Sequence, residues 1–314
     1  AQVSVLLGEP DQAARIEASL AGVRIDSDAV DNSGGVDLSD HEVNYKILLA
    51  PLVRSGRLSA EQRHAALFGA SADACESVLA HNRGQALALS LDERRSRREP
   101  QSYLRAALAL CDEADVDPAA LGLPDEKLVA ARAAQGRGFV RPEVAVMLGL
   151  AKLVTRNALA LDAMTDAAYL APLFAGYFPP PFREAWPDAL RGHRLRREIT
   201  ALVVTNRLID AGGAALVPTL VAELGVPVPD VATALLIAED LLGIEQRRAA
   251  LCALGGAVAR DAVYDALLEV DRGVRSVARL LVKSGAAVLS GAAREHLGSR
   301  RTIQNTQIDT FLSD

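Results

Sequence analysis

The chain has 314 residues, a mass of 33.2 kDa and a formal net charge of −6 at pH 7. This length accommodates two domains of ordinary size and excludes a peptide hormone or a disulfide-stabilised miniprotein. Half of the residues are hydrophobic but only 4% are aromatic, so we expect a helical core of Ala, Leu and Val rather than a β-sandwich or barrel. The acidic balance argues against nucleic acid as a partner.

The cysteines and the N-terminal sequence indicate which cellular compartment to expect. Cys75, Cys111 and Cys252 are widely spaced and form no C-x-x-C pair, so neither a disulfide framework nor a zinc site is expected. No stretch approaches about 18 uninterrupted apolar residues, and the N-terminus lacks the pattern of a signal peptide. We therefore expect a cytoplasmic chain with no bound metal and no membrane association.

The first fifty residues predict an α-β-loop-α unit. Pro10 starts a helix that Gly22 ends. Residues 23–27, V-R-I-D-S, alternate apolar and polar side chains as a strand does. Residues 31–35, D-N-S-G-G, are rich in types that tolerate turns and left-handed backbone.

A longer helix is expected after this turn. Ser39 and Glu42 have the spacing of a capping box, which places the start of the helix at Asp40. The helix should run to about Arg54, with Gly56 as its stop. It would complete the α-β-loop-α unit.

The remainder of the chain is expected to be all-helical, because nearly every segment has helical periodicity. Ser59 and Gln62 form a second capping box, and Pro142 occupies the first position of a helix to about Leu159. The principal break is Q-G-R-G at 135–138. Further helices are predicted over residues 193–212, 231–243 and 257–285. The last two are largely apolar and are expected in the interior.

Residues 28–42, D-A-V-D-N-S-G-G-V-D-L-S-D-H-E, are the most informative stretch. Its paired glycines would let a ligand approach the backbone, and the helix N-terminus beyond them offers free amides to a carboxylate or phosphate. An ordinary strand-to-helix turn would also need these glycines for its φ angles, and the residues alone favour that interpretation.

Two other compositional features have plain structural interpretations. The arginine runs at 94–98 and 191–197 are expected on solvated helix faces. The segment Y-F-P-P-P-F-R-E-A-W at 177–186 could be a docking ridge, but a packed corner between helices explains it better.

Four segments resemble one protein family. N-S-G-G-V-D-L-S-D-H-E at 32–42 is similar to the N-A-G-G-V-x-x-S-x-x-E element of glutamate dehydrogenases. The closer resemblance is to the large NAD-specific enzymes of bacteria, and it extends over residues 31–49, 141–153, 177–184 and 193–200. The four segments occur in the order that the family has, so the resemblance covers most of the chain.

The resemblance implies roles for individual residues. Asn32 would contact the nicotinamide end of NAD, and Gly34 and Gly35 would keep the backbone near the cofactor clear of side chains. Ser39 would contact the carboxylate of L-glutamate or 2-oxoglutarate. No residue of this chain is assigned a catalytic role or a metal.

Other parts of the dehydrogenase machinery are missing from the sequence. It has no G-x-G-x-x-G turn with an acidic ribose partner, since G-R-G-F-V-R at 136–141 lacks the third glycine. Lys127, Lys152 and Lys283 all fall in helical patterns, where a solvated or snorkelling lysine is expected. The chain thus resembles the C-terminal portion of a larger polypeptide and is expected to be inactive alone.

This interpretation divides the chain into four parts. Residues 1–56 would end the catalytic dinucleotide-binding domain, and residues 57–138 would be a helical connecting region. Residues 139–298 would form a helical C-terminal domain, and residues 299–314 a polar tail. The family implies a cytoplasmic homo-oligomer in which this segment contacts the upstream part of the same polypeptide. The alternative is a helical scaffold or regulatory module with no catalytic role.

Overall fold

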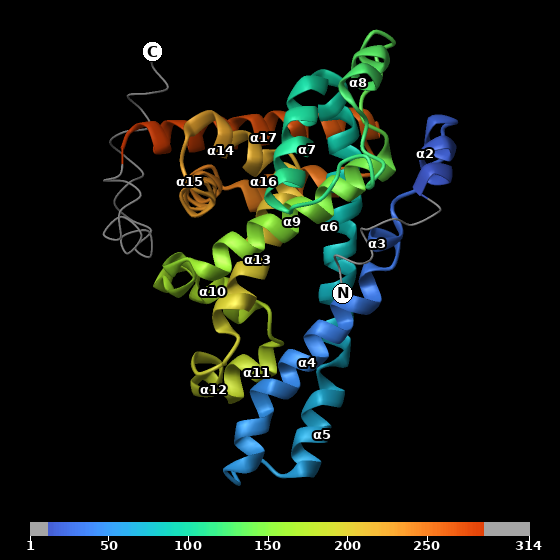
Figure 1. The fold of residues 1–314 in the computed structure, drawn as a ribbon. Coiled ribbons are helices and arrows are strands. Elements are labelled where there is room, and N and C mark those ends of the chain that lie inside the picture. The colour runs from blue at the N-terminus through green and yellow to red at the C-terminus, as the bar shows by residue number, and fades with distance from the viewer. Residues whose placement is uncertain (1–11, 286–314) are drawn as a thin grey trace. The chain divides into compact units, whose positions relative to one another are not determined.

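The computed structural model describes residues 12–285, and every regular element in that range is a helix (Figure 1). The prediction of a mainly α-helical protein is therefore confirmed. The described residues form two compact units. The first contains residues 12–161 and 172–219, and the second contains residues 162–171 and 220–285.

Short connections join the helices. In chain order the α-helices are α2 (Gln12–Leu20), α3 (Asp28–Asp31), α4 (Ser33–Arg54), α5 (Ala60–Gly69), α6 (Ser71–Arg98), α7 (Pro100–Glu113), α8 (Glu126–Ala133), α9 (Arg141–Leu161), α10 (Ala171–Gly176), α11 (Pro180–Ala185), α12 (Pro187–Arg191), α13 (Arg196–Gly212), α14 (Leu216–Leu224), α15 (Val228–Leu241), α16 (Ile244–Ala253) and α17 (Arg260–Lys283). Two short 3₁₀ helices, η1 (Ala163–Asp166) and η2 (Ala168–Leu170), lie between α9 and α10.

Helix α9 is the central helix of the first unit, where it packs against α2, α6, α7 and α13. Its residues 144–148 are all buried, as are Leu150 and Ala151. The helix is long and apolar enough to span a membrane by composition alone, but half of its most apolar stretch is buried against other helices. Burial on nearly every side explains why so few of its residues are polar.

An aromatic corner closes the other end of the first unit. Phe178 and Phe182 are buried against Tyr45 and Leu49 of α4, and the rings of Tyr45 and Phe182 meet edge to face at 5.2 Å. Trp186 packs on Phe182 at the same centroid distance. The prediction of a packed corner at residues 177–186 is confirmed.

A buried hub joins α6 to the bend between α13 and α14. The carboxylate of Asp92, which is fully buried, accepts hydrogen bonds from Arg95 at 2.7 Å and from the backbone amide of Ala214 at 2.8 Å. A side chain at Gly213, whose φ is +87°, would collide with this carboxylate. Arg95 and Ser96 are buried, so the prediction that the run at 94–98 is a solvated face is wrong for these two residues. Arg97 and Arg98 are exposed.

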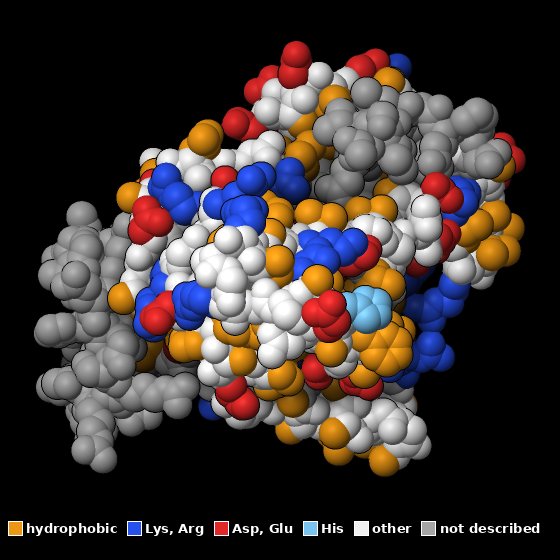
Figure 2. Space-filling model, turned by 90° about the horizontal axis from the view of Figure 1, so that it is seen from below, with side chains coloured by type: hydrophobic (Ala, Val, Ile, Leu, Met, Phe, Trp, Pro, Cys, Tyr) orange, Lys and Arg blue, Asp and Glu red, His pale blue; other side chains and the backbone are white. Residues whose placement is uncertain are grey.

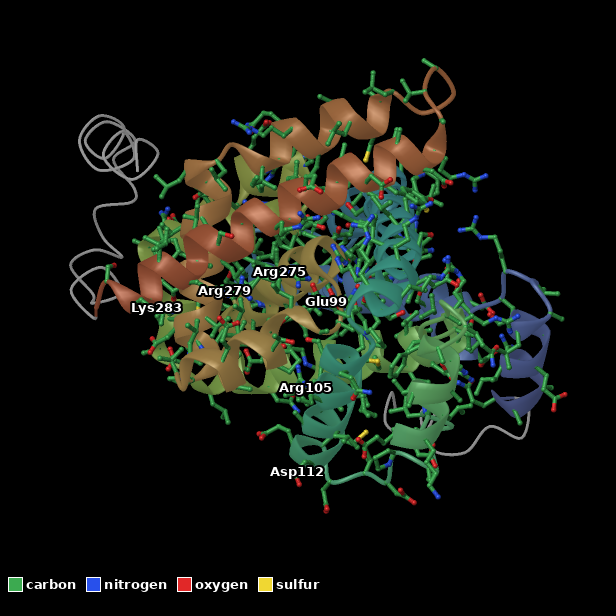
Figure 3. The ribbon with its side chains drawn as sticks, turned by 90° about the horizontal axis from the view of Figure 1, so that it is seen from above. Glu99, Arg105, Asp112, Arg275, Arg279 and Lys283 are labelled. Atoms are coloured by element: carbon green, nitrogen blue, oxygen red, sulfur yellow. The ribbon has the colours of Figure 1, made fainter. Side chains whose placement is uncertain are left out.

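The second unit is built around α15, which packs against α16 and α17. Residues 231–239 of α15 are all buried, as its apolar sequence predicted. In contrast, α17 buries only one face, through Val263, Leu267, Val274 and Ala278. On its exposed side Arg279 lies between Arg275 and Lys283 (Figure 3) and binds both carboxylate oxygens of Glu223, at 2.8 and 2.9 Å. The prediction that this helix is interior holds for one face only.

The predicted strand and loop are not present. Residues 23–27 are extended without a neighbouring strand in residues 12–285, and the α-β-loop-α unit of a dinucleotide-binding domain is therefore not formed in the described structure. A strand needs a partner to bond its backbone groups. Two side-chain contacts attach this segment to neighbouring helices. Arg141 of α9 pairs with Asp26, and Arg24 donates to Ser90 of α6 at 3.2 Å.

Several expected helix ends are confirmed, but one start is wrong. Helix α4 begins at Ser33 instead of Asp40 and ends at Arg54 as predicted. The Ser59–Gln62 capping box is present at α5. Helices α9, α13, α15 and α17 match the predicted ranges closely. The predicted tail, residues 299–314, and the end of the predicted domain 139–298 lie outside the described residues.

The predicted domain boundary at 138/139 stays a prediction. The two compact units divide the chain at other positions, after residues 161, 171 and 219.

On the face drawn in Figure 2, basic, acidic and hydrophobic side chains are interspersed. Among the side chains drawn there, neither sign of charge forms a continuous patch.

Candidate functional site

The N-terminal half of α4 lines a cavity of about 370 Å³ in the first unit. Helices α3, α6, α9 and α13 supply the other walls. Leu148, Leu153 and Leu202 make part of the lining apolar, whereas Asp37 and Lys152 are among its charged groups. Ligand sites usually combine such apolar walls with a few polar groups.

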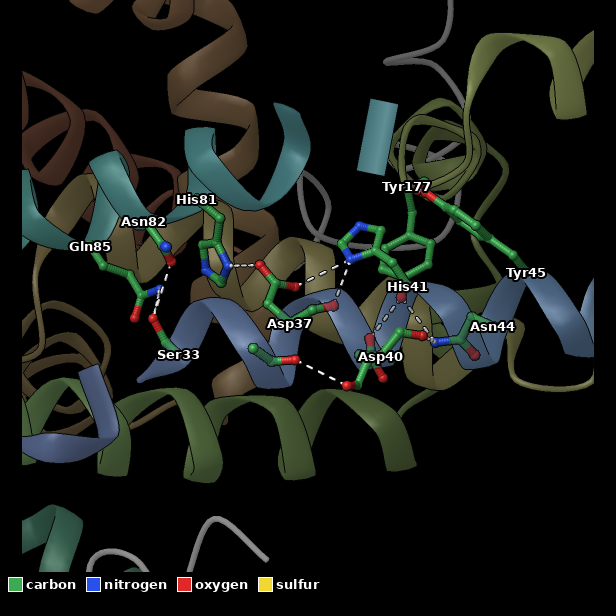
Figure 4. Close-up of polar contacts among 12 residues, drawn as sticks. Ser33, Asp37, Asp40, His41, Asn44, Tyr45, His81, Asn82, Gln85 and Tyr177 are labelled. Carbon is green, nitrogen blue, oxygen red and sulfur yellow. Dashed lines mark hydrogen bonds and ion pairs between the residues drawn. The ribbon is translucent and has the colours of Figure 1, made fainter. Parts of the chain in front are cut away.

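A chain of alternating charges lies at this cavity. His81 of α6 forms an ion pair with Asp37 of α4, with 2.9 Å between Nδ1 and Oδ2 (Figure 4). His81 Nε2 lies 3.2 Å from Oδ2 of Asp210 on α13, and Asp210 Oδ1 lies 2.7 Å from Nζ of Lys152 on α9. His41 adds a second contact to Asp37, 3.3 Å between Nδ1 and Oδ1. Four helices are thus joined through one network.

The network shifts the pKa of each histidine and of Asp37. Burial alone would raise the pKa of Asp37, but hydrogen bonds from His41 and His81 and their positive charge hold it well below its usual 3.8. Burial would lower the pKa of His81. The contacts with Asp210 and Asp37 outweigh the effect of burial, so the pKa of His81 rises above 6.5. The pKa of His41 is raised in the same way by Asp37. Asp37 is therefore charged, and both imidazoles hold their protons to higher pH.

A second set of polar contacts fixes the middle of α4. The Tyr177 hydroxyl donates to Asp40 at 2.7 Å and accepts from the Asn44 amide at 3.0 Å (Figure 4). Burial and the nearby Asp40 carboxylate raise the pKa of Tyr177. The His41 ring stacks on the Tyr177 ring, with centroids 4.3 Å apart. These contacts fix the rotation of α4 about its axis.

The structure places the predicted ligand-contacting residues at the start of α4 and in its first two turns, but only some of them line the cavity. Asn32 occupies the N-cap position of the helix, without a capping hydrogen bond from its side chain, and lines the cavity. Ser39 is exposed and does not line the cavity, and its hydroxyl donates to the Gly35 carbonyl at 3.0 Å. Ser39 therefore lies inside the helix and is not its N-cap, so the predicted Ser39–Glu42 capping box is wrong.

The two glycines are helical and do not form a turn. A Cβ at Gly34 would lie 3.0 Å from the Asn82 amide nitrogen of α6, so this glycine permits a close approach of two helices. Gly35 is exposed, with only Asn32 Oδ1 near its Cβ position, at 3.9 Å. Gly35 thus leaves open backbone next to Asn32, whereas the space beside Gly34 is taken by α6.

The charged network was not predicted from the sequence. Lys152, predicted to be solvated or snorkelling, is mostly buried and paired with Asp210. The i,i+4 spacing of Asp37 and His41 indicates one contact of the network. Nothing in the pattern shows that His81 and Asp210 meet them, because that contact depends on helix packing.

Within residues 12–285, no group of three or more His, Cys, Asp or Glu side chains is arranged to hold a metal ion. The three cysteines are free thiols, of which Cys111 is buried. Burial raises the pKa of Cys111 to about 11. This thiol is therefore protonated at neutral pH and is a poor nucleophile.

Comparison with known families identifies the chain. The model described as "Glutamate dehydrogenase, C-terminal" matches residues 136–301, just over half of the chain, and "Bacterial NAD-glutamate dehydrogenase, catalytic domain" matches residues 7–92. The chain belongs to the bacterial NAD-glutamate dehydrogenases. The first of these matches begins inside the predicted Q-G-R-G break, and the second ends within α6.

Curated relatives agree with this assignment. The NAD-specific glutamate dehydrogenase of Pseudomonas aeruginosa is 36% identical over 230 residues, 73% of this chain. That of Halomonas elongata is 32% identical over 272 residues, 87% of the chain, and that of Mycobacterium tuberculosis is 31% identical over 73% of it. The aligned part is only 14% to 17% of these dehydrogenases, so the chain corresponds to a small part of a large polypeptide.

Proposed function

We propose that this chain is the C-terminal segment of an enzyme that converts L-glutamate, NAD⁺ and water to 2-oxoglutarate, ammonia and NADH. The observation that carries the proposal is the order of the two family matches: a catalytic-domain match over residues 7–92 precedes a C-terminal match over residues 136–301. The names of the relatives support NAD as the cofactor of the complete enzyme.

Within that enzyme, Asn32 and Gly35 contact the nicotinamide end of NAD, and Ser39 contacts the substrate carboxylate. Both Asn32 and Ser39 are exposed, so that a ligand can reach them. Gly34 also remains a proposed cofactor contact, and the Asn82 side chain of α6 lies beside the position that its Cβ would take. The chain offers no glycine-rich turn for the cofactor phosphates, so its residues orient one end of the cofactor and are catalytically incomplete alone.

The experiment compares glutamate-dependent NADH formation by this chain and by a version extended upstream through the nucleotide-binding and lysine-bearing regions. We expect activity only in the extended version. Two folded proteins without activity would contradict the dehydrogenase proposal and favour a helical scaffold.

Substitution of Ser39 tests its role more sharply. In the extended enzyme, Ser39→Ala is expected to raise KM for glutamate about 10-fold or more, because a hydrogen bond to a charged group contributes ~1.5–3 kcal/mol. The matched control is Ser276→Ala, since Ser276 is also exposed within a helix and donates to the carbonyl four residues earlier. An unchanged KM in Ser39→Ala would remove Ser39 from the substrate site.

Substitution of Asn32 separates the cofactor role from a structural one. Asn32→Ala is expected to raise KM for NAD while the assembly state stays the same. If activity and assembly fell together, Asn32 would have a structural role only.

On the family resemblance alone, the complete enzyme is proposed to be a cytoplasmic homo-oligomer in which this segment contacts the upstream part of its own polypeptide. Sedimentation of the extended protein tests the assembly. A monomer at micromolar concentration would contradict it.

A further inference from the structure

The lining of the cavity beside α4 includes polar groups that the charged network does not use. Each acid at the cavity has a nearby partner: Asp37 contacts two histidines, Asp40 accepts from Tyr177, and Asp28 lies 3.8 Å from Arg15. Lys152 is occupied by Asp210. Basic groups thus oppose the charges of Asp28 and Asp37, whereas the partner of Asp40 is an uncharged hydroxyl.

Arg156 lies one helical turn beyond Lys152 on α9 and also lines the cavity. Its guanidinium donates only to the neighbouring Asn157 side chain, at 3.3 Å, and none of the described carboxylates pairs with it. A half-buried guanidinium without an acidic partner is suited to a carboxylate or phosphate, because its planar fork donates two parallel hydrogen bonds.

Helix α13 adds two more donors to the lining of the cavity. Thr205 is fully buried, lines the cavity, and its hydroxyl has no partner among the described residues. Asn206 lines the cavity as well, one turn before Asp210, and its amide bonds none of the described residues. A buried hydroxyl without a partner destabilises the fold, and a hydrogen bond to a ligand atom would offset that cost.

The remaining walls fit the body of a small organic molecule. Leu148 and Leu153 of α9, Leu202 of α13 and Val36 of α4 line the cavity. Its volume of about 370 Å³ lies within the range of small-molecule sites, ~300–1,000 Å³. Ser39, the residue assigned to the substrate carboxylate, lies outside this lining.

We propose that this cavity binds a small organic anion, with its carboxylate or phosphate held by Arg156, Thr205 and Asn206 and its apolar body against Leu148, Leu153 and Leu202. The site does not include the proposed substrate contact at Ser39, although Asn32, the proposed NAD contact, also lines the cavity. It does not depend on dehydrogenase activity, so binding can be measured on this chain whether or not the enzyme proposal holds.

The test is isothermal titration of the purified chain with three probes. These are 4-methylpentanoate, its uncharged counterpart 4-methylpentanamide, and inorganic phosphate. We expect 4-methylpentanoate to bind at least 10-fold more tightly than the amide, because the charge-assisted bonds to Arg156 are lost in the amide. Tighter binding of phosphate than of 4-methylpentanoate would identify the anion as a phosphate; tighter binding of 4-methylpentanoate would identify it as a carboxylate.

Three variants locate the binding. Arg156→Gln is expected to weaken binding of the preferred anion about 10-fold or more, and Thr205→Val about 3-fold, since it removes one neutral hydrogen bond without changing the volume. Arg57→Gln removes an exposed arginine that does not line the cavity and should leave binding unchanged. Circular dichroism and thermal midpoints show that each variant is folded.

Three results would overturn the proposal. One is the absence of heat from every probe at about 10 mM, a concentration above any functional Kd of millimolar order. Another is equal binding of 4-methylpentanoate and 4-methylpentanamide. The third is an Arg156→Gln variant that is folded and binds as tightly as Arg57→Gln.

Discussion

The two halves of α4 pack against the rest of the first unit by different means. The N-terminal half uses Asp37 and His41 in a network of charges, whereas the C-terminal half uses Tyr45, Leu48 and Leu49 in an apolar corner. Apolar packing is indifferent to pH and depends on volume. The strength of the charged network depends on the protonation of its side chains and on the direction of their hydrogen bonds, and a cavity lies beside the network.

The largest effect is expected in the apolar half. Phe178→Ala should lower the free energy of unfolding by about 3–5 kcal/mol, because Phe178 is almost fully buried against Tyr45 and Phe174 and its removal leaves a cavity. Urea unfolding measures it, with Phe68→Ala as the control, since Phe68 is 78% exposed. A loss below about 1 kcal/mol would show that the corner is loosely packed.

Removing the central acid of the network should have a smaller effect. Asp37→Asn leaves His41 and His81 without their shared carboxylate and should cost about 1–3 kcal/mol at pH 6. The matched control is Asp188→Asn, which removes an exposed acid paired with Arg191 and should cost under about 1 kcal/mol. Equal losses in both variants would mean that the network contributes no more than a surface pair.

The network also predicts a pH dependence that the apolar half lacks. The raised pKa values of His41 and His81 mean that their contribution is full below 6.5 and is lost as pH rises through the folded pKa. The lowered pKa of Asp37 means that its contribution is full above 3.8 and is lost as pH falls through the folded pKa. Between these limits, at about pH 4–6.5, the network stabilises the fold most.

Thermal midpoints measured from pH 5 to pH 9 test this. The double variant His41→Gln/His81→Gln should lose less stability than the wild type over the alkaline part of that range. His64→Gln, at an exposed position, should follow the wild-type curve. If all three curves were parallel, the pKa values of the two histidines would be the same in the folded and unfolded states.

The smallest predicted effect is a difference in the loss of stability between alanine variants of Ser39 and Ser59, the two serines that have the capping-box spacing. Ser59→Ala should cost about 1 kcal/mol, because Ser59 caps α5. Ser39→Ala should change the free energy of unfolding by under about 0.5 kcal/mol, since Ser39 is exposed inside α4. Equal costs would restore a helix start at Asp40.

The contrast between Ser39 and Ser59 shows what local pattern can decide. Both serines precede Glu or Gln by three residues. At Ser59 the preceding segment is a turn that includes Gly56, with a φ of +71°, so the helix has to start there. At Ser39 the preceding residues continue as helix back to Ser33, because Gly34 packs against Asn82 of α6. Propensity is a weak guide where packing opposes it.

The sequence by itself determined the helical class, several helix ends, the aromatic corner and the family. Apolar periodicity, proline and glycine act within a few residues, and four separated motifs fall in the family's order. Only the tertiary structure decided that residues 23–27 pair with no strand in the described part of the chain, that Lys152 is mostly buried, and that Asp37, His81, Asp210 and Lys152 meet. These outcomes depend on which helix faces approach one another across long separations in the chain, and local pattern carries no information about that approach.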